Sequence, residues 1–208
     1  MEKLYGKLNM SWMKTLLFAV ITGIYTGAVM LVPALENTSF QDIGVMVECW
    51  LIFAVIIVVN CNSGWEASLK CFVFFLISQP LVYLVQIAIG YLDFSMALGF
   101  YKYWFIWTLL TLPGGYIAFF CKKQNALGAV VLGLGNSILA MMGVYYVLSV
   151  MNDFPHHILS VFVCFAGIAV QTLYIQKKTK NRIITFSTII VVMLVLGVFL
   201  KLTGRIII

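Results

Sequence analysis

Seven long stretches of mostly apolar residues make up most of the chain, and only short gaps separate them. A helix needs about 20 consecutive apolar residues to cross the hydrocarbon core of a bilayer. The stretches that meet this requirement are residues 12–33, 42–60, 66–90, 102–121, 125–150, 156–176 and 183–201. The pattern predicts an all-α, polytopic integral membrane protein with seven transmembrane helices, in a single transmembrane helical domain over residues 1–208.

The composition excludes a soluble protein. Of the 208 residues, 63% are hydrophobic and 10% are charged, whereas soluble domains usually carry about 25% charged residues. A domain of this length has too much surface for its volume to keep so many apolar side chains away from water. In lipid those side chains can remain exposed at no cost.

The shortest gap, residues 121–124, decides how many helices are expected. It contains Lys122 and Lys123, and two adjacent lysines inside the hydrocarbon core would be costly. We therefore expect a turn at the membrane surface rather than one long helix. The first apolar stretch is longer than the core of a signal peptide and no clear cleavage motif follows it, so we expect it to be retained.

Basic residues predict the orientation, because cytoplasmic loops carry an excess of lysine and arginine. The N-terminal arm and the second, fourth and sixth connections carry Lys3, Lys7, Lys14, Lys70, Lys122, Lys123, Lys177, Lys178, Lys180 and Arg182. The opposite ends carry Lys102, Lys201 and Arg205. We predict a cytoplasmic N-terminus and a C-terminus outside, in a cell (plasma) membrane. No water-facing segment is long enough for a basic nucleic-acid surface, so we expect no nucleic-acid partner.

Glu48 is the most informative single residue, because it lies about two turns inside the outer end of the second stretch. A carboxyl group at that depth is costly and usually faces protein or water. One interpretation is a proton- or cation-coupled site. The other is a protonated glutamic acid that hydrogen-bonds a neighbouring helix. The sequence does not separate the two.

The third stretch carries a polar stripe. Gln79, Tyr83 and Gln86 lie at i, i+4 and i+7, so they share one helix face and are expected to face the bundle interior. Pro80 removes a backbone donor and frees a carbonyl near Leu76. A kinked helix of this kind can bind substrate in a transporter, or its freed groups can be satisfied by Ser78 or Gln79.

Small residues mark other helices. Pro113, Gly114 and Gly115 in the fourth stretch form either a hinge or a site of close packing. The spacings Gly23-x-x-x-Gly27 and Ala129, Gly133, Ser137 favour close helix contact within the chain over a dedicated dimer interface. Asn136 is a further polar group in the fifth stretch, and we treat it as a candidate member of a network with Glu48 and Gln79.

Aromatic residues Tyr101, Tyr103, Trp104 and Trp107 gather at the start of the fourth stretch. They are typical of an interfacial belt, and this explanation is preferred to an aromatic cage for a cation. At the second connection, Glu66 and Lys70 have the favourable i,i+4 order and are predicted to pair at a solvated helix start.

Asp153, His156 and His157 in the fifth connection could ligate a metal. Adjacent histidines on a short loop rarely converge, and no third or fourth ligand is visible, so we predict a polar loop and no metal site. No H-E-x-x-H, G-x-S-x-G or Walker A motif is present, so we expect no cofactor and do not assign an enzymatic activity.

The leading functional hypothesis is a small-solute transporter or permease-type protein. Its interior site would use Glu48, Gln79, Tyr83 and Gln86, with Asn136 as a further candidate, and Pro80, Pro113, Gly114 and Gly115 as hinge candidates. A second hypothesis is a non-catalytic subunit or assembly factor of a membrane complex, and the weakest is an intramembrane lipid-modifying enzyme. The expected partners are the lipid bilayer, a small-molecule or ion substrate and, on the second hypothesis, another membrane protein.

Overall fold

The computed structural model describes residues 5–36, 38–152, 154 and 156–202, with the backbone alone at 43–45. The described residues fold into helices and connections, with no strand among them. In chain order the elements are α1 (Trp12–Val29), η1 (Pro33–Leu35), α2 (Ser39–Val45), α3 (Val47–Val59), α4 (Gly64–Ala88), α5 (Phe94–Ala118), η2 (Phe119–Lys122), α6 (Ala126–Asn152), α7 (Ile158–Ile175) and α8 (Thr179–Leu202).

Seven helical segments in the described part of the chain are long and apolar enough to cross a membrane, as predicted. The fourth starts at Phe94, earlier than the predicted residue 102, so the third connection is shorter than expected. The second consists of α2 and α3, because Met46 has extended backbone angles (φ −76°, ψ 153°) that interrupt the helix. Gly44 and the β-branched Val45 and Val47 lower helix propensity around this break.

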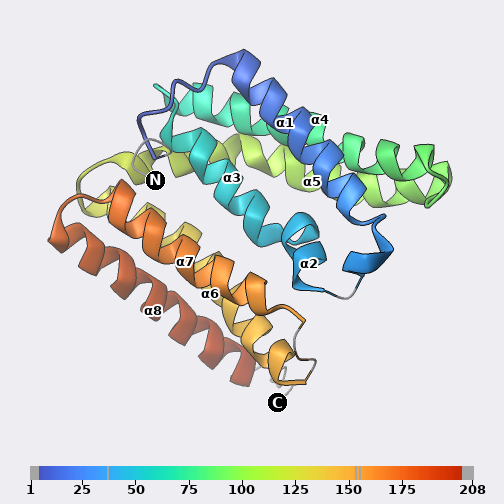
Figure 1. Ribbon diagram of the computed structural model, residues 1–208. Coiled ribbons are helices and arrows are strands. Elements are labelled where there is room, and N and C mark those ends of the chain that lie inside the picture. Colours follow the sequence, from blue (N-terminus) through green and yellow to red (C-terminus); the bar gives the residue numbers. More distant parts are fainter. Residues whose placement is uncertain (1–4, 37, 153, 155, 203–208) are drawn as a thin grey trace.

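The long helices form two groups with α3 between them (Figure 1). Helices α1, α4 and α5 pack against one another through α4, and α6 packs against both α7 and α8. Helix α3 contacts α4 and α5 in the first group and α6 and α7 in the second. The side chains of α3 therefore reach both groups.

Small residues allow the closest helix approaches, which confirms that they serve packing within the chain. A Cβ added at Gly23 would lie 2.6 Å from the Ser78 carbonyl oxygen, so α1 can approach α4 only with glycine there. A Cβ at Gly133 would lie 2.6 Å from Thr188 Cβ, which brings α6 against α8 in the same way. Such faces let backbones approach closely in helical membrane proteins.

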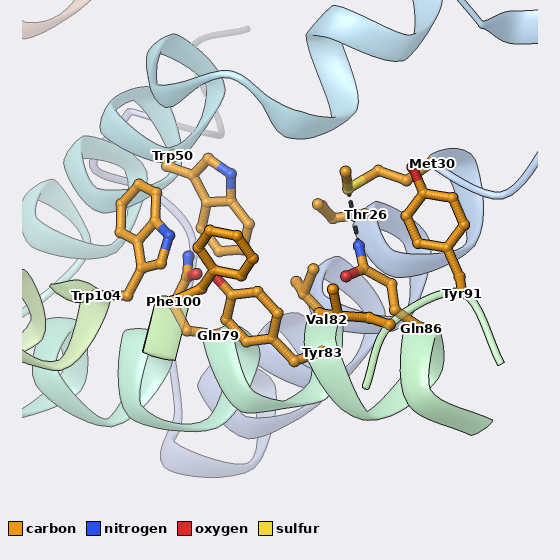
Figure 2. A pocket seen from close by; sticks show the side chains of 11 residues that line it. Thr26, Met30, Trp50, Gln79, Val82, Tyr83, Gln86, Tyr91, Phe100 and Trp104 are labelled. Carbon is orange, nitrogen blue, oxygen red and sulfur yellow. Dashed lines mark hydrogen bonds between the residues drawn. The ribbon is translucent and has the colours of Figure 1, made fainter. Parts of the chain in front are cut away.

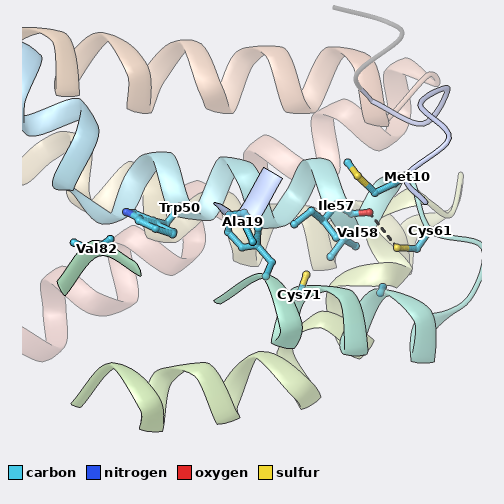
Figure 3. Close-up of a cluster of buried hydrophobic side chains, with 10 residues drawn as sticks. Met10, Ala19, Trp50, Ile57, Val58, Cys61, Cys71 and Val82 are labelled. Atoms are coloured by element: carbon cyan, nitrogen blue, oxygen red, sulfur yellow. Dashed lines mark hydrogen bonds between the residues drawn. The ribbon is translucent and has the colours of Figure 1, made fainter. Parts of the chain in front are cut away.

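An aromatic cluster fills the contact between α1, α3 and α4. The ring centroid of Trp50 lies 5.9 Å from that of Phe74 and 5.8 Å from that of Phe75. Figure 3 shows Trp50 at one end of a row of buried side chains that continues through Ile57 and Val58 to Cys61. Aromatic pairs at such separations stabilise a core beyond simple burial.

The N-terminal arm is bound to the connection between α3 and α4. The side-chain oxygen of Asn60 accepts hydrogen bonds from the backbone N–H groups of Gly6 (3.1 Å) and Leu8 (2.7 Å). Lys70 Nζ donates to the Met10 carbonyl and pairs with Glu66 at 2.5 Å. The predicted pairing is confirmed, but the expectation of a solvated site is wrong for Lys70, which is 2% exposed because the arm covers it.

Candidate functional site

A cavity of about 250 Å³ lies between α1, α3, α4 and α5. Its lining residues are Thr26, Met30, Trp50, Gln79, Val82, Tyr83, Gln86, Tyr91, Leu92, Phe100 and Trp104. Figure 2 shows side chains from these elements facing one another across the cavity. The volume corresponds to about eight water molecules at about 30 Å³ each, which is enough for a small organic molecule.

Helix α4 presents the polar side of the cavity. Gln79, Tyr83 and Gln86 line it together with Val82, as the i, i+3, i+4 and i+7 spacing requires. The predicted polar stripe therefore faces the interior of the bundle. Helix α4 runs through Pro80 from Gly64 to Ala88, so these side chains share one continuous helix.

The two glutamine amides have different surroundings. Gln86 Nε2 donates to the sulfur of Met30 at 2.9 Å, which holds this amide against the end of α1 (Figure 2). Gln79 is 4% exposed, and Figure 2 shows its amide close to Trp50 and Trp104. A primary amide offers two donors and an acceptor, so both glutamines can bind a polar group in the cavity.

Aromatic rings form the rest of the wall. The Tyr83 and Phe100 rings stack, with centroids 6.4 Å apart and planes inclined by 14°. Trp104, which was predicted to belong to an interfacial belt, lines the cavity, whereas Trp107 and Tyr103 are exposed. Neighbouring aromatic residues of α5 thus face either the cavity or the outer surface of the helix bundle.

Five further residues that were not predicted as site residues also line this cavity, namely Thr26, Met30, Trp50, Tyr91 and Phe100. Most residues around Trp50 and Phe100 are apolar, whichever way they face. No pattern within these segments distinguishes a cavity wall from a lipid-facing ring. These assignments require the packing of four helices.

A second cavity, of about 410 Å³, adjoins the first, because Met30 and Tyr91 line both. Its lining includes Glu36, Gln41 and Asp42, whereas the first cavity has no charged lining residue. Its other lining residues are Leu31, Val32, Pro33 and Met46. A cavity with acidic lining residues therefore adjoins an aromatic and amide-lined chamber.

Glu48 lies outside both cavities. Its carboxyl group is fully buried, and Oε2 accepts a hydrogen bond of 3.0 Å from the Tyr146 hydroxyl of α6. Its Oε1 is buried without a hydrogen-bond partner, as is the Ser160 hydroxyl of α7. Glu48 therefore extends from α3 toward α6 and α7, and it lies apart from Gln79, Tyr83 and Gln86.

Asn136 is also separate from the α4 stripe. Its amide nitrogen donates to Thr172 Oγ1 at 3.2 Å across the α6–α7 contact, and its Oδ1 is buried without a hydrogen-bond partner. Gln171, which directly precedes Thr172 in α7, is also buried, and neither polar atom of its amide has a hydrogen-bond partner. The suggested network of Asn136 with Glu48 and Gln79 is therefore not formed by direct hydrogen bonds.

The hinge candidates lie in continuous helices. Pro113 and Gly114 are inside α5, and a Cβ at Gly114 would have nothing within 4 Å. A Cβ at Gly115 would lie 3.0 Å from Ser68 Cα, and Ser68 Oγ donates to the Leu112 carbonyl at 2.6 Å. Gly115 serves the close packing of α5 on α4, while a hinge motion at Pro80 or Pro113 stays a prediction.

A separate polar cluster joins α2 to the start of α7. His156 Nε2 lies 3.0 Å from Asp42 Oδ1, and His157 Nδ1 lies 2.9 Å from Asp42 Oδ2. The His157 ring also stacks on Tyr146, with centroids 5.2 Å apart. Asp153, the other candidate ligand considered with these histidines, lies outside the described residues.

Comparisons of the chain with protein-family models, with curated proteins and with solved structures found no match.

Proposed function

We propose that this chain is an integral membrane protein that binds a small organic solute in the cavity beside α4 and carries it across the bilayer. The observation that supports this most directly is the convergence of Gln79, Tyr83 and Gln86 with aromatic rings from α3 and α5 around one chamber. Ligand sites are typically concave and mostly apolar, with a few polar groups that fix orientation.

The charge of the two cavities favours an uncharged or cationic solute. Five aromatic side chains line the inner chamber, namely Trp50, Tyr83, Tyr91, Phe100 and Trp104. Ring faces attract cations, and an anion would find no basic side chain in the lining. Glu36 and Asp42 in the adjoining cavity would raise the local concentration of a cation before it enters.

In the orientation proposed from the basic residues, the cavity lined by Glu36 and Asp42 faces the outside. Lys122 and Lys123 lie at one end of the bundle, where Lys122 Nζ donates to the Cys61 carbonyl. Glu36 lies in the connection between α1 and α2, and Asp42 lies in α2. Both are at the opposite end of the membrane-spanning helices from the two lysines. With the lysine-rich end in the cytoplasm, solute would enter from outside.

Movement of the solute requires a second state, and the elements around the chamber have features that can support one. Pro80 in α4 and Pro113 in α5 each remove a backbone hydrogen bond from their helix. The second span is interrupted at Met46, which itself lines the outer cavity. Interrupted helices beside a binding site are a recurring feature of transporters.

The test is solute binding and uptake with the full chain in lipid nanodiscs and proteoliposomes. A panel of uncharged, monocationic and anionic organic solutes is screened by quenching of tryptophan fluorescence, since Trp50 and Trp104 line the chamber. For the solutes that bind, we expect Gln79→Leu and Gln86→Leu together to weaken binding and uptake at least tenfold, the effect of about 1.4 kcal/mol of lost hydrogen bonding.

Gln171→Leu is the matched control, because it also removes a buried amide but lies in α7, away from the chamber. Glu48→Gln should likewise leave binding unchanged, since Glu48 does not line the chamber. Equal weakening by the control, or no solute in the panel that binds, would contradict the proposal.

A further inference from the structure

Three side chains with metal-ligating atoms meet where α2 faces the start of α7. One ligand atom each from Asp42, His156 and His157 lies within 4.8 Å of the other two. Asp42 is 6% exposed, and the histidine side chains are 18% and 13% exposed. The cluster is therefore mostly enclosed by protein.

The backbone explains how two adjacent histidines come to face the same way. His157 has a left-handed conformation with φ of 64°, which is uncommon for residues other than glycine, although histidine adopts it more often than most. With this turn the two imidazole rings stack, with centroids 3.9 Å apart and planes inclined by 18°. Both rings then approach the Asp42 carboxyl group.

Asp42 supplies the third ligand that the sequence did not reveal. It is separated from His156 by 114 residues and reaches the cluster through the packing of α2 on α7. His157 Nδ1 is 2.9 Å from Asp42 Oδ2 but forms no hydrogen bond. The Nδ1 atom of His157 is therefore buried without a hydrogen-bond partner.

We propose that Asp42, His156 and His157 form a binding site for a divalent transition-metal cation, with Zn²⁺ as the best match. Zinc binds imidazole nitrogen at about 2.0–2.1 Å and carboxylate oxygen at about 2.0–2.2 Å, so ligand atoms around it lie about 3.3 Å apart. The imidazole nitrogens lie 3.0 Å from Asp42 Oδ1 and 2.9 Å from Asp42 Oδ2, and one ligand atom of each residue lies within 4.8 Å of the other two, so modest side-chain shifts would place all three around one ion. Two nitrogen donors disfavour Mg²⁺ and Ca²⁺, which prefer oxygen.

The cluster borders the outer cavity through Asp42. Asp42 lines the 410 Å³ cavity together with Glu36 and Gln41. A zinc ion with three protein ligands keeps one position for water or another molecule.

The competing explanation is a tether without metal. Asp42 Oδ2 accepts a hydrogen bond of 3.2 Å from the His157 backbone N–H, so the carboxylate also binds the N-terminal end of α7. In that case His156 Nε2 also shares a hydrogen bond of 3.0 Å with Asp42 Oδ1, which a bound cation would replace. The two explanations differ in whether the rings bind a cation.

The experiment is metal binding by the full chain, purified in detergent with a tag that contains no histidine. The chain has two histidines, and both are in this cluster, so imidazole ¹⁵N resonances report on this site alone. We expect one equivalent of Zn²⁺ to shift both resonances, and Co²⁺ to give the visible absorption of a nitrogen- and oxygen-ligated ion. Unshifted resonances in the wild-type protein at about 1 mM Zn²⁺ would overturn the proposal.

Variants test the ligand set independently of solute binding. Asp42→Asn, His156→Gln and His157→Gln should each weaken Zn²⁺ affinity at least tenfold in calorimetry. Asp93→Asn is the control, because Asp93 is an exposed carboxylate before α5 that lines neither cavity, and the Zn²⁺ affinity of this variant should stay within threefold of the wild type. Equal affinity in the wild type and the three ligand variants would overturn the site. The wild-type imidazole spectrum decides the matter even if a ligand variant fails to fold.

Discussion

Asn60 holds the N-terminal arm against the bundle with one side chain. Its Oδ1 accepts from Gly6 and Leu8, while its Nδ2 donates to the Ile56 carbonyl at 2.8 Å and so caps the end of α3. A side chain that satisfies three backbone groups is difficult to replace. The arm in turn covers Lys70 through Met10.

We expect Asn60→Ala to lower the free energy of unfolding by about 2 kcal/mol, since net hydrogen bonds contribute about 1 kcal/mol each and the arm would detach. Thermal unfolding in detergent measures the loss, and limited proteolysis near Gly6 reports on the arm. Asn62→Ala is the control, because Asn62 is exposed and follows the same helix end. An arm that remains protected in Asn60→Ala would contradict this role.

Glu48 shows how one buried carboxyl group can connect helices that are far apart in the sequence. Its bond to Tyr146 spans 98 residues and joins α3 to α6. It lies in the first turn of α3. The break at Met46, two residues before Glu48, starts α3. The interruption of the second span therefore determines where Glu48 lies in its helix.

At the scale of helices, α6 offers a direct test of close packing, because two of its glycines differ only in what they face. A Cβ at Gly133 would lie 2.6 Å from Thr188 Cβ and 2.9 Å from the Thr185 carbonyl oxygen of α8, whereas a Cβ at Gly135 would have nothing within 4 Å. Helix propensity is the same for both sites, so packing alone separates them.

Gly133→Ala is expected to destabilise the protein by about 1–3 kcal/mol, because the added methyl group separates α6 from α8. Gly135→Ala should be neutral or stabilising by up to about 1 kcal/mol, since alanine favours helix more than glycine does. Thermal unfolding of both variants in the same detergent compares them. If the two midpoints shift equally, the α6–α8 contact is not as close as described.

At the scale of the whole molecule, the proposed orientation predicts which connections face the outside of the cell. Asp93 precedes α5 and Lys178 precedes α8, and both are exposed. With the N-terminus in the cytoplasm, Asp93 would lie outside and Lys178 inside. All five native cysteines are buried, so they should give little background in labelling. Burial also raises the pKa of the Cys61 thiol to about 11, which keeps it protonated and unreactive.

We therefore expect Asp93→Cys to react with a membrane-impermeant maleimide in intact cells. Lys178→Cys should react only after the cells are permeabilised. The unsubstituted protein measures the background. The reverse pattern would place the C-terminus in the cytoplasm and would direct the solute cavity inward.

The positions of the apolar helices and the polar face of α4 were predictable from the sequence. Both depend on local quantities, namely the length of an apolar run and the angle between residues on one helix. Gln79, Tyr83 and Gln86 could be grouped because the geometry of a single helix brings them together. Boundaries were less predictable at Phe94, which begins α5 although Lys102 follows eight residues later, and at Met46, where residues 43–47 carry no charged side chain.

Tertiary structure decided which polar groups meet. Glu48 contacts Tyr146, which is 98 residues away in the sequence, and Asp42 contacts His156, which is 114 residues away. No periodicity in the sequence relates positions so far apart. In a chain this apolar, nearly every helix face can lie against lipid or another helix, so composition does not specify the neighbours. The packing of α3 between the two helix groups specifies them, and it separates the solute cavity from the carboxyl and imidazole cluster.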